Sequence, residues 1–195
     1  MQVLTTQAKG IVAVDFVHVD TAFLKRIYAL IVVEHGSRRA HLAGITANPT
    51  GAWTAQAARN VLMEFGERVD TLTVVLRDRD SRFTRAVDAV VAAAGVWILA
   101  SPTQAPRSNA ICERTMGSLR RELLDQLLMV NERHLRRVLA VYLRHFNTAR
   151  PHRSLRQLAP AQAETRPPTP IDLANYRVQR RPIHDGLTSE CKIVA

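Results

Sequence analysis

The apolar residues in the first 160 positions follow two different periods. Five short runs rich in β-branched residues predict strands at 11–19, 26–34, 39–46, 71–76 and 96–99. The first three runs are joined by short links, which predicts an antiparallel meander. The last two are separated by a helical pattern, so we expect them to pair in parallel within the same sheet.

Apolar positions at helical spacing predict helices at 53–65, 85–94, 108–128 and 131–150. The predicted order is βββαβαβα, an α/β fold with a five-stranded mixed sheet flanked by helices. Trp53 and Trp97 are both expected in its core. We divide the chain into a leader (1–9), a core (10–158) and an irregular tail rich in proline and arginine (159–195).

The charge of the chain is high and unevenly distributed. The net charge is +10 and the sequence pI is about 10.9. Residues 1–70 carry seven basic and six acidic side chains, whereas residues 71–195 carry twenty and eleven. All but three of the 27 basic residues are arginines, whose planar fork can bond two phosphate oxygens at once. The basic second part therefore indicates a nucleic acid or another anionic partner.

Several protein classes are disfavoured by what the sequence contains. Cys112 and Cys191 form neither a disulfide framework nor a zinc-binding pattern. The sequence has no apolar run of membrane-spanning length, and its first residues, MQVLTTQAKG, show no signal-peptide pattern. We therefore predict a cytoplasmic protein without a membrane partner.

Three carboxylates occupy positions that suit metal-ion chemistry. Asp15 lies within a buried strand pattern, Asp78 directly follows the strand TVVL, and Glu113 lies early in the helix after a proline-bearing loop. Each has an ordinary alternative role, as an ion pair, a turn cap or a helix-surface residue. Together they predict a site on one rim of the sheet for two Mg²⁺ or Mn²⁺ ions, which prefer oxygen ligands and promote phosphoryl transfer.

The residues around these carboxylates resemble the catalytic core of retroviral-type integrases and insertion-sequence transposases. The matching segments are VAVDFVHVDT, LRDRDSRFT and SPTQAPRSNAICERTMGSL, with 34 residues between Asp78 and Glu113. The segment HFNTARPHRSL resembles a motif that follows the core in bacterial members. The resemblance covers about residues 10–160 and implies an RNase H-like fold with Asp15, Asp78 and Glu113 as catalytic metal ligands.

The resemblance also implies a DDE-type polynucleotidyl transferase. In such a reaction, water frees a 3′-hydroxyl at the end of a mobile element, and that hydroxyl then attacks target DNA. The implied partners are double-stranded DNA and further copies of the chain, without a small-molecule substrate, and the implied location is the nucleoid of a bacterium. From the helix geometry, Arg120 should reach a phosphate near the metals, and Arg107 and Asn109 could do likewise from the preceding loop.

Alternatives remain at the level of residues and of function. Asp20 could replace Asp15, and Asp80 could replace Asp78. A stand-alone RNase H-like nuclease would share the fold and the metal ions. A truncated, non-catalytic DNA-binding remnant of a mobile element is a third hypothesis, because no DNA-binding domain precedes the first strand in this sequence.

Overall fold

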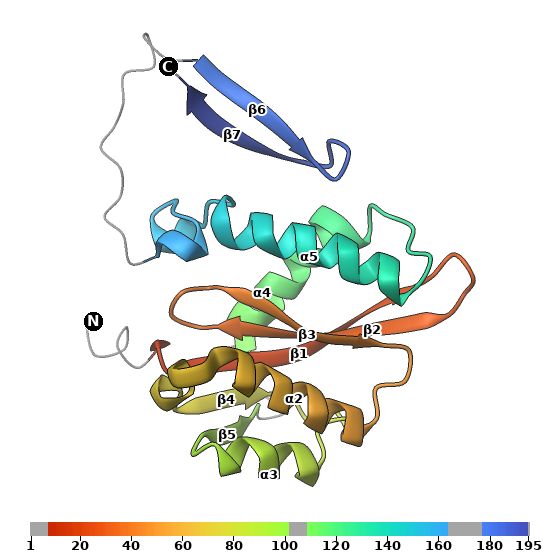
Figure 1. Ribbon diagram of the computed structural model, residues 1–195, viewed down its shortest axis with the longest axis vertical. Helices are drawn as coiled ribbons and strands as arrows, with labels where there is room; N and C mark the ends of the chain where they lie inside the picture. Colours follow the sequence, from red (N-terminus) through yellow and green to blue (C-terminus); the bar gives the residue numbers. More distant parts are fainter. Residues whose placement is uncertain (1–7, 102–108, 164–176, 195) are drawn as a thin grey trace.

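The protein is described by a computed structural model, which places residues 8–101, 109–163 and 177–194. A five-stranded mixed sheet forms its centre, with the strands in the order β3-β2-β1-β4-β5 (Figure 1). The strands are β1 (Ile11–Asp20), β2 (Arg26–Glu34), β3 (Ala40–Thr46), β4 (Val74–Arg77) and β5 (Trp97–Ala100). β1, β2 and β3 pair antiparallel and β4 pairs in parallel with β5, as the sequence predicted, and β4 also pairs in parallel with β1.

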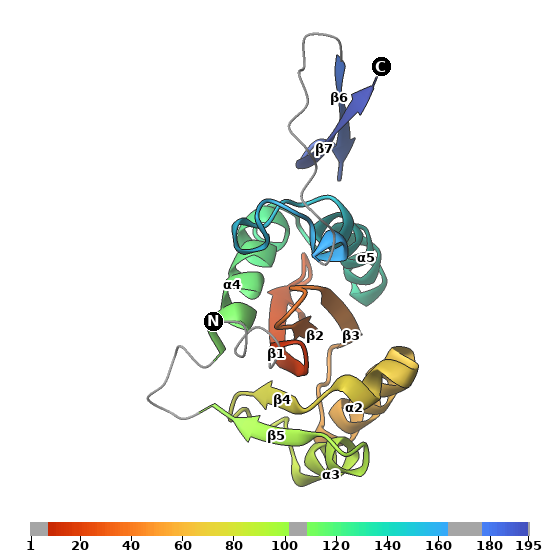
Figure 2. The same cartoon turned by 90° about the vertical axis from the view of Figure 1, so that its left-hand side faces the viewer.

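Helices cover both faces of the sheet (Figures 1 and 2). The helices are α2 (Gly51–Phe65), α3 (Arg85–Ala93), α4 (Ala110–Leu119) and α5 (Glu132–Thr148). The Thr50 and Asn131 side chains cap α2 and α5 by accepting backbone N–H bonds. Residues of β1 alternate between the two cores: Ala13 and Val17 pack on the α4 and α5 side, and Val12 packs on the α2 and α3 side.

The helix predicted at 108–128 is shorter and changes its winding. α4 ends at Leu119, and a π-helical turn follows at Arg120–Leu124. The backbone N–H of Asp125 donates to the carbonyl oxygen of Arg120 at 2.9 Å, five residues back. Leu119, Leu123 and Leu124 are all buried across this wider turn, so core packing accompanies the change in winding.

Two other expectations were wrong. Trp97 is 78% exposed, because it begins β5, an edge strand of the sheet with few covering side chains. The tail is not irregular throughout: β6 (Arg177–Ile183) and β7 (Thr188–Val194) form an antiparallel hairpin. β6 is almost wholly exposed and contains Pro182, so it lacks the buried alternation by which strands are recognised.

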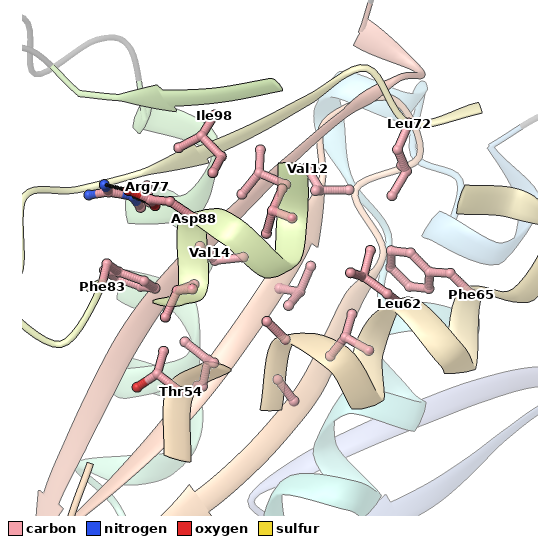
Figure 3. A pocket seen from close by; sticks show the side chains of 18 residues that line it. Val12, Val14, Thr54, Leu62, Phe65, Leu72, Arg77, Phe83, Asp88 and Ile98 are labelled. Atoms are coloured by element: carbon pink, nitrogen blue, oxygen red, sulfur yellow. Dashed lines mark hydrogen bonds and ion pairs between the residues drawn. The ribbon is translucent and has the colours of Figure 1, made fainter. Parts of the chain in front are cut away.

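A small apolar cavity of about 50 Å³ lies between the sheet and helices α2 and α3 (Figure 3). Val12, Leu62, Phe65 and Ile98 line it, and the Arg77–Asp88 ion pair lies at its edge. Because Val12 faces away from the side on which Ala13 and Val17 pack, this cavity is separate from the carboxylates considered below. Within the described residues, no helix is long and apolar enough to cross a membrane.

Gly44 in β3 allows a close approach of α2. A Cβ atom at this position would lie 2.7 Å from Cζ2 of Trp53. We expect Gly44→Val to lower the free energy of unfolding by about 1–3 kcal/mol, since Trp53 must shift, and Gly44→Ala to have a smaller effect. Urea unfolding followed by tryptophan emission, in a Trp97→Phe background, isolates the signal of Trp53. Unchanged stability and emission in Gly44→Val would contradict this packing.

Candidate active site

Asp15 and Asp78 come from neighbouring parallel strands at the same level of the sheet. Val14 of β1 pairs with Arg77, the last residue of β4, so Asp15 and Asp78 occupy the next positions along this ladder. Adjacent strands are about 4.8 Å apart. Ala13 and Leu76 both belong to the core beneath α4 and α5, and by the alternation of the strands Asp15 points to the same side. The register therefore brings two carboxylates together where β4 ends.

Glu113 lies on α4, which packs against this same side of the sheet. Cys112, Met116 and Leu119 form the buried face of α4, and Glu113 lies beside it and is exposed. Within the described part of the chain, no hydrogen bond or ion pair holds the Glu113 side chain. Burial raises the pKa of the Cys112 thiol, and the charges of Asp15, Asp78 and Glu113 raise it further, which places this thiol near all three carboxylates. The thiol therefore remains neutral and serves as core packing.

Asp15 is in an unfavourable electrostatic environment as a carboxylate. Burial raises its pKa from an ordinary value of 3.8 to about 6, against the opposing effect of the Phe16 backbone N–H, which donates to Oδ1 at 2.7 Å. Repulsion from Asp78, Asp80 and Glu113 contributes in the same direction as burial. These acidic groups thus act on Asp15 as one cluster, and a bound cation would relieve both the burial and the repulsion.

The two alternative aspartates have cationic partners. Asp20 is exposed and accepts two hydrogen bonds from Arg26, at 2.9 and 3.1 Å. Asp80 forms an ion pair with Arg82 at 2.7 Å. Asp78 instead accepts the backbone N–H of Asp80 at 3.0 Å, and neither Asp15 nor Asp78 forms an ion pair within the described residues. These contacts favour Asp15 and Asp78 as the carboxylates available to a cation.

Two arginines that the sequence analysis did not single out hold the loop after β4. Arg77 forms a two-bond ion pair with Asp88 of α3, at 3.1 and 2.9 Å, and also donates to the backbone oxygen of Asp78. The guanidinium of Arg82 lies over the rings of Phe16 and Tyr28, with its carbon 5.2 and 4.3 Å from their centroids. In the sequence, only the position of Arg77 next to Asp78 indicated a link between these arginines and the site. Asp88, Phe16 and Tyr28, which contact Arg77 or Arg82, lie in other elements.

The residues present fit a divalent cation in chemistry but are not arranged as a closed site. Carboxylate oxygens are the preferred ligands of Mg²⁺ and Mn²⁺. Among residues 8–101, 109–163 and 177–194, no three His, Cys, Asp or Glu side chains are arranged so that they could hold a metal ion. The strand register places Asp15 and Asp78, whereas no hydrogen bond or ion pair within the described residues fixes the Glu113 side chain.

The three residues expected to contact DNA differ in their surroundings. Arg107 lies outside the described residues. Asn109 precedes α4 and is only 5% exposed, with no hydrogen-bond partner for its Oδ1 atom within the described structure. Arg120 begins the π-helical turn, and its Nη2 atom donates to the backbone oxygen of His18 in β1 at 3.3 Å. Arg120 is therefore tied to the strand that carries Asp15, whereas Asn109 does not reach the surface in this arrangement.

Comparisons with known proteins agree with this architecture. Residues 94–160 match a family model described as an integrase core domain. The chain is 28% identical over 180 residues to an uncharacterized 39.2 kDa protein of insertion element IS476 from Xanthomonas euvesicatoria, covering 90% of this chain and 48% of that protein. It is also 28% identical over 151 residues to an uncharacterized 31.7 kDa protein of insertion element IS407 from Burkholderia multivorans, covering 77% and 53%. The chain thus spans about half the length of these curated relatives.

Solved structures show the same fold at low sequence identity. The catalytic core domain of BIV integrase aligns with a TM-score of 0.58 and 16% identity, covering 79% of this chain and 92% of that one. The HTLV-2 integrase catalytic core domain, solved in complex with magnesium in a dimeric form, aligns with a TM-score of 0.55 and 15% identity, covering 71% and 86%. The fold is therefore that of retroviral integrase catalytic cores. The family model over residues 94–160 and the insertion-element relatives at 28% identity are similar to this chain in agreement with that fold.

Proposed function

We propose that this chain is the catalytic core of a DDE-type transposase that cleaves and joins DNA strands. The observation that carries the proposal is the meeting of Asp15 and Asp78 on adjacent parallel strands beneath the helix that bears Glu113. The raised pKa of Asp15, caused by its burial and by the surrounding acidic groups, supports the binding of divalent cations there. The solved HTLV-2 integrase core in complex with magnesium is consistent with this choice of metal.

In this proposal, Asp15, Asp78 and Glu113 would hold two Mg²⁺ or Mn²⁺ ions. Such ions stabilise the charge that develops on a phosphoryl group during in-line displacement. In the first step, a water oxygen bonds to phosphorus at the end of the element and the 3′-oxygen leaves. In the second, the 3′-hydroxyl loses its proton as its oxygen bonds to a target phosphorus, and the displaced 3′-oxygen takes up a proton. The first step therefore hydrolyses one phosphodiester, and the second forms one and breaks one.

The remaining residues of the site orient these carboxylates and the DNA. The ion pairs of Arg77 with Asp88 and of Arg82 with Asp80 hold the loop that follows Asp78. We propose Arg107 and Arg120 as phosphate contacts, while Asn109 would contact DNA only if its buried side chain became exposed. The partners would be the DNA of element ends and targets and other copies of the chain, in the cytoplasm of a bacterium.

The test is a strand-transfer assay on pre-cut element ends with Mn²⁺. We expect strand-transfer product from the wild type and more than about a hundredfold less product from Asp78→Asn. Removing a group that only orients a metal ligand lowers activity by about ten- to a hundredfold, and removing a ligand itself should lower it further. Asp20→Asn is the matched control, since Asp20 is exposed and paired with Arg26. Equal product from the wild type and Asp78→Asn, or none from either, would remove the support for a catalytic assignment.

The same assay separates the proposal from a stand-alone nuclease. Hydrolysis products without joined strands would favour an RNase H-like nuclease, which shares the fold and the metal ions. DNA binding without metal-dependent cleavage would instead favour a non-catalytic remnant of a mobile element. The relatives are proteins of insertion elements, which supports a role connected with mobile DNA.

A further inference from the structure

A second polar pocket, of about 390 Å³, lies between α4, the β2–β3 turn and the segment that follows α5. Its charge is one-sided. The ionisable side chains that line it are Arg38, Arg114, Arg121, Arg150, Arg153 and His152, and no Asp or Glu lines it. Arg114 follows Glu113 on α4 and points about 100° away from it around the helix. The pocket is therefore separate from the carboxylate cluster.

Four of these five arginines have no carboxylate partner within the described structure. The exception is Arg150, which forms two hydrogen bonds with Glu122, at 2.9 and 2.5 Å. Glu122 also accepts the hydroxyl of Tyr142, so its carboxylate is already committed. Arg121 interacts with Glu122 only through its charge, and Arg38, Arg114 and Arg153 form no ion pair within the described residues.

Arg38, in the turn between β2 and β3, lines the pocket. It is half-buried, and its Nε and Nη1 atoms are fully buried without a hydrogen-bond partner in the described residues. Its backbone has a positive φ of 66°, which is uncommon for a residue with a long side chain. Burial lowers the pKa of Arg38, and the charge of Arg114 lowers it further. A guanidinium in this state is costly to bury unless an anion bonds to it.

His152, which also lines the pocket, has a buried polar atom without a hydrogen-bond partner. Its Nε2 atom is buried without a partner in the described structure, and its ring packs edge-on against Phe146. Burial lowers the pKa of His152 to about 4, and the charges of Arg150 and Arg38 contribute in the same direction. Two residues far apart in the sequence thus present unpartnered polar atoms beside the same cationic pocket.

We propose that this pocket binds a phosphate-type oxyanion. Arginine forks match the geometry of phosphate oxygens, and Ser118 and Ser154, which also line the pocket, carry hydroxyl donors. The volume is several times the roughly 30 Å³ that a water molecule occupies in the liquid, so a phosphate group fits. The anion could be a backbone phosphate of DNA or a free phosphate or nucleotide. The inference holds whether or not the carboxylate cluster is catalytic.

The first arm of the test measures binding of radiolabelled inorganic phosphate by equilibrium dialysis, at fixed ionic strength and in EDTA. We expect saturable binding to the wild type and binding at least about tenfold weaker in Arg38→Gln, since a charged hydrogen bond is lost. Arg153→Gln provides a second variant at an exposed position, where the substitution leaves the core packing intact. Arg59→Gln, an exposed residue of α2, is the control with the same change of charge.

The second arm measures binding of duplex DNA by the same four proteins and its ability to displace phosphate. Displacement, with weaker DNA binding in Arg38→Gln and Arg153→Gln than in Arg59→Gln, would identify a backbone phosphate as the ligand. Saturable phosphate binding that DNA does not displace would identify a free phosphate or nucleotide. The proposal is overturned if neither ligand binds more weakly to the two pocket variants than to Arg59→Gln. Both binding measurements are made in EDTA, which removes divalent metal ions. A negative result would therefore contradict the anion pocket without contradicting the proposed metal-dependent activity.

Discussion

Replacement of Asp15 by Asn is expected to abolish metal-dependent strand transfer while stabilising the metal-free protein. The loss of activity should exceed about a hundredfold, since Asp15 is proposed as a metal ligand. The gain in stability follows from removing a buried negative charge that lies near Asp78, Asp80 and Glu113. The pKa of about 6, against an ordinary 3.8, corresponds to roughly 1–3 kcal/mol at neutral pH.

The pH dependence of stability tests the same charge. Because the pKa of Asp15 is raised in the folded state, the unfolded state binds fewer protons to this group between pH 4 and pH 6. The destabilising effect of Asp15 is therefore absent below about pH 4, grows as the pH rises, and is complete above about pH 6. In metal-free buffer, the wild type should lose stability relative to Asp15→Asn across this window.

Thermal and urea unfolding in EDTA, from pH 4 to pH 8, measure this difference. Added Mg²⁺ should raise the melting temperature of the wild type and have little effect on Asp15→Asn. Asp20→Asn serves as the control, because Asp20 is exposed and bonded to Arg26. A variant that is less stable than the wild type at pH 8 would show that Asp15 is a stabilising structural residue instead.

Glu122→Ala is expected to cause a large loss of stability. The Glu122 carboxylate accepts two hydrogen bonds from Arg150 and one, at 2.7 Å, from the hydroxyl of the fully buried Tyr142. Burial acts to raise the pKa of Glu122, but the bonds from Arg150 and Tyr142 outweigh it, and the pKa is lowered. Removing the carboxylate would leave a hydroxyl and a guanidinium without their acceptor, at a cost of about 3 kcal/mol.

Urea unfolding of a graded set of variants checks this network. Tyr142→Phe removes one bond and should cost about 1 kcal/mol, and Glu122→Gln, which keeps an acceptor oxygen, should lie between Tyr142→Phe and Glu122→Ala. Glu132→Ala is a matched control, since this exposed carboxylate bonds only to the backbone N–H of Ala47 in the described structure. Equal effects of Glu122→Ala and Glu132→Ala would contradict a special role for the Glu122 network.

The sequence by itself determined the order of the core elements, the antiparallel meander of β1 to β3 and the parallel pairing of β4 with β5. Runs of apolar residues mark buried strands, and a helix between two strands forces them to run in parallel, so local patterns were sufficient. The same reasoning placed Asp15 mid-way along one strand and Asp78 at the end of another. The pairing register of β1 with β4 then places Asp15 and Asp78 at the same level of the sheet, where the two carboxylates can share a site.

The tertiary structure alone decided the features that depend on contacts between distant segments. The exposure of Trp97 follows from the edge position of β5, and the β6–β7 hairpin forms because two exposed strands satisfy one another's backbone groups. The bonds of Glu122 to Arg150 and the cationic pocket around Arg38 join residues from different elements. Hydrophobic periodicity indicates which face of an element is buried. It does not indicate which polar groups of other elements meet at that face, because those contacts depend on how the elements pack together.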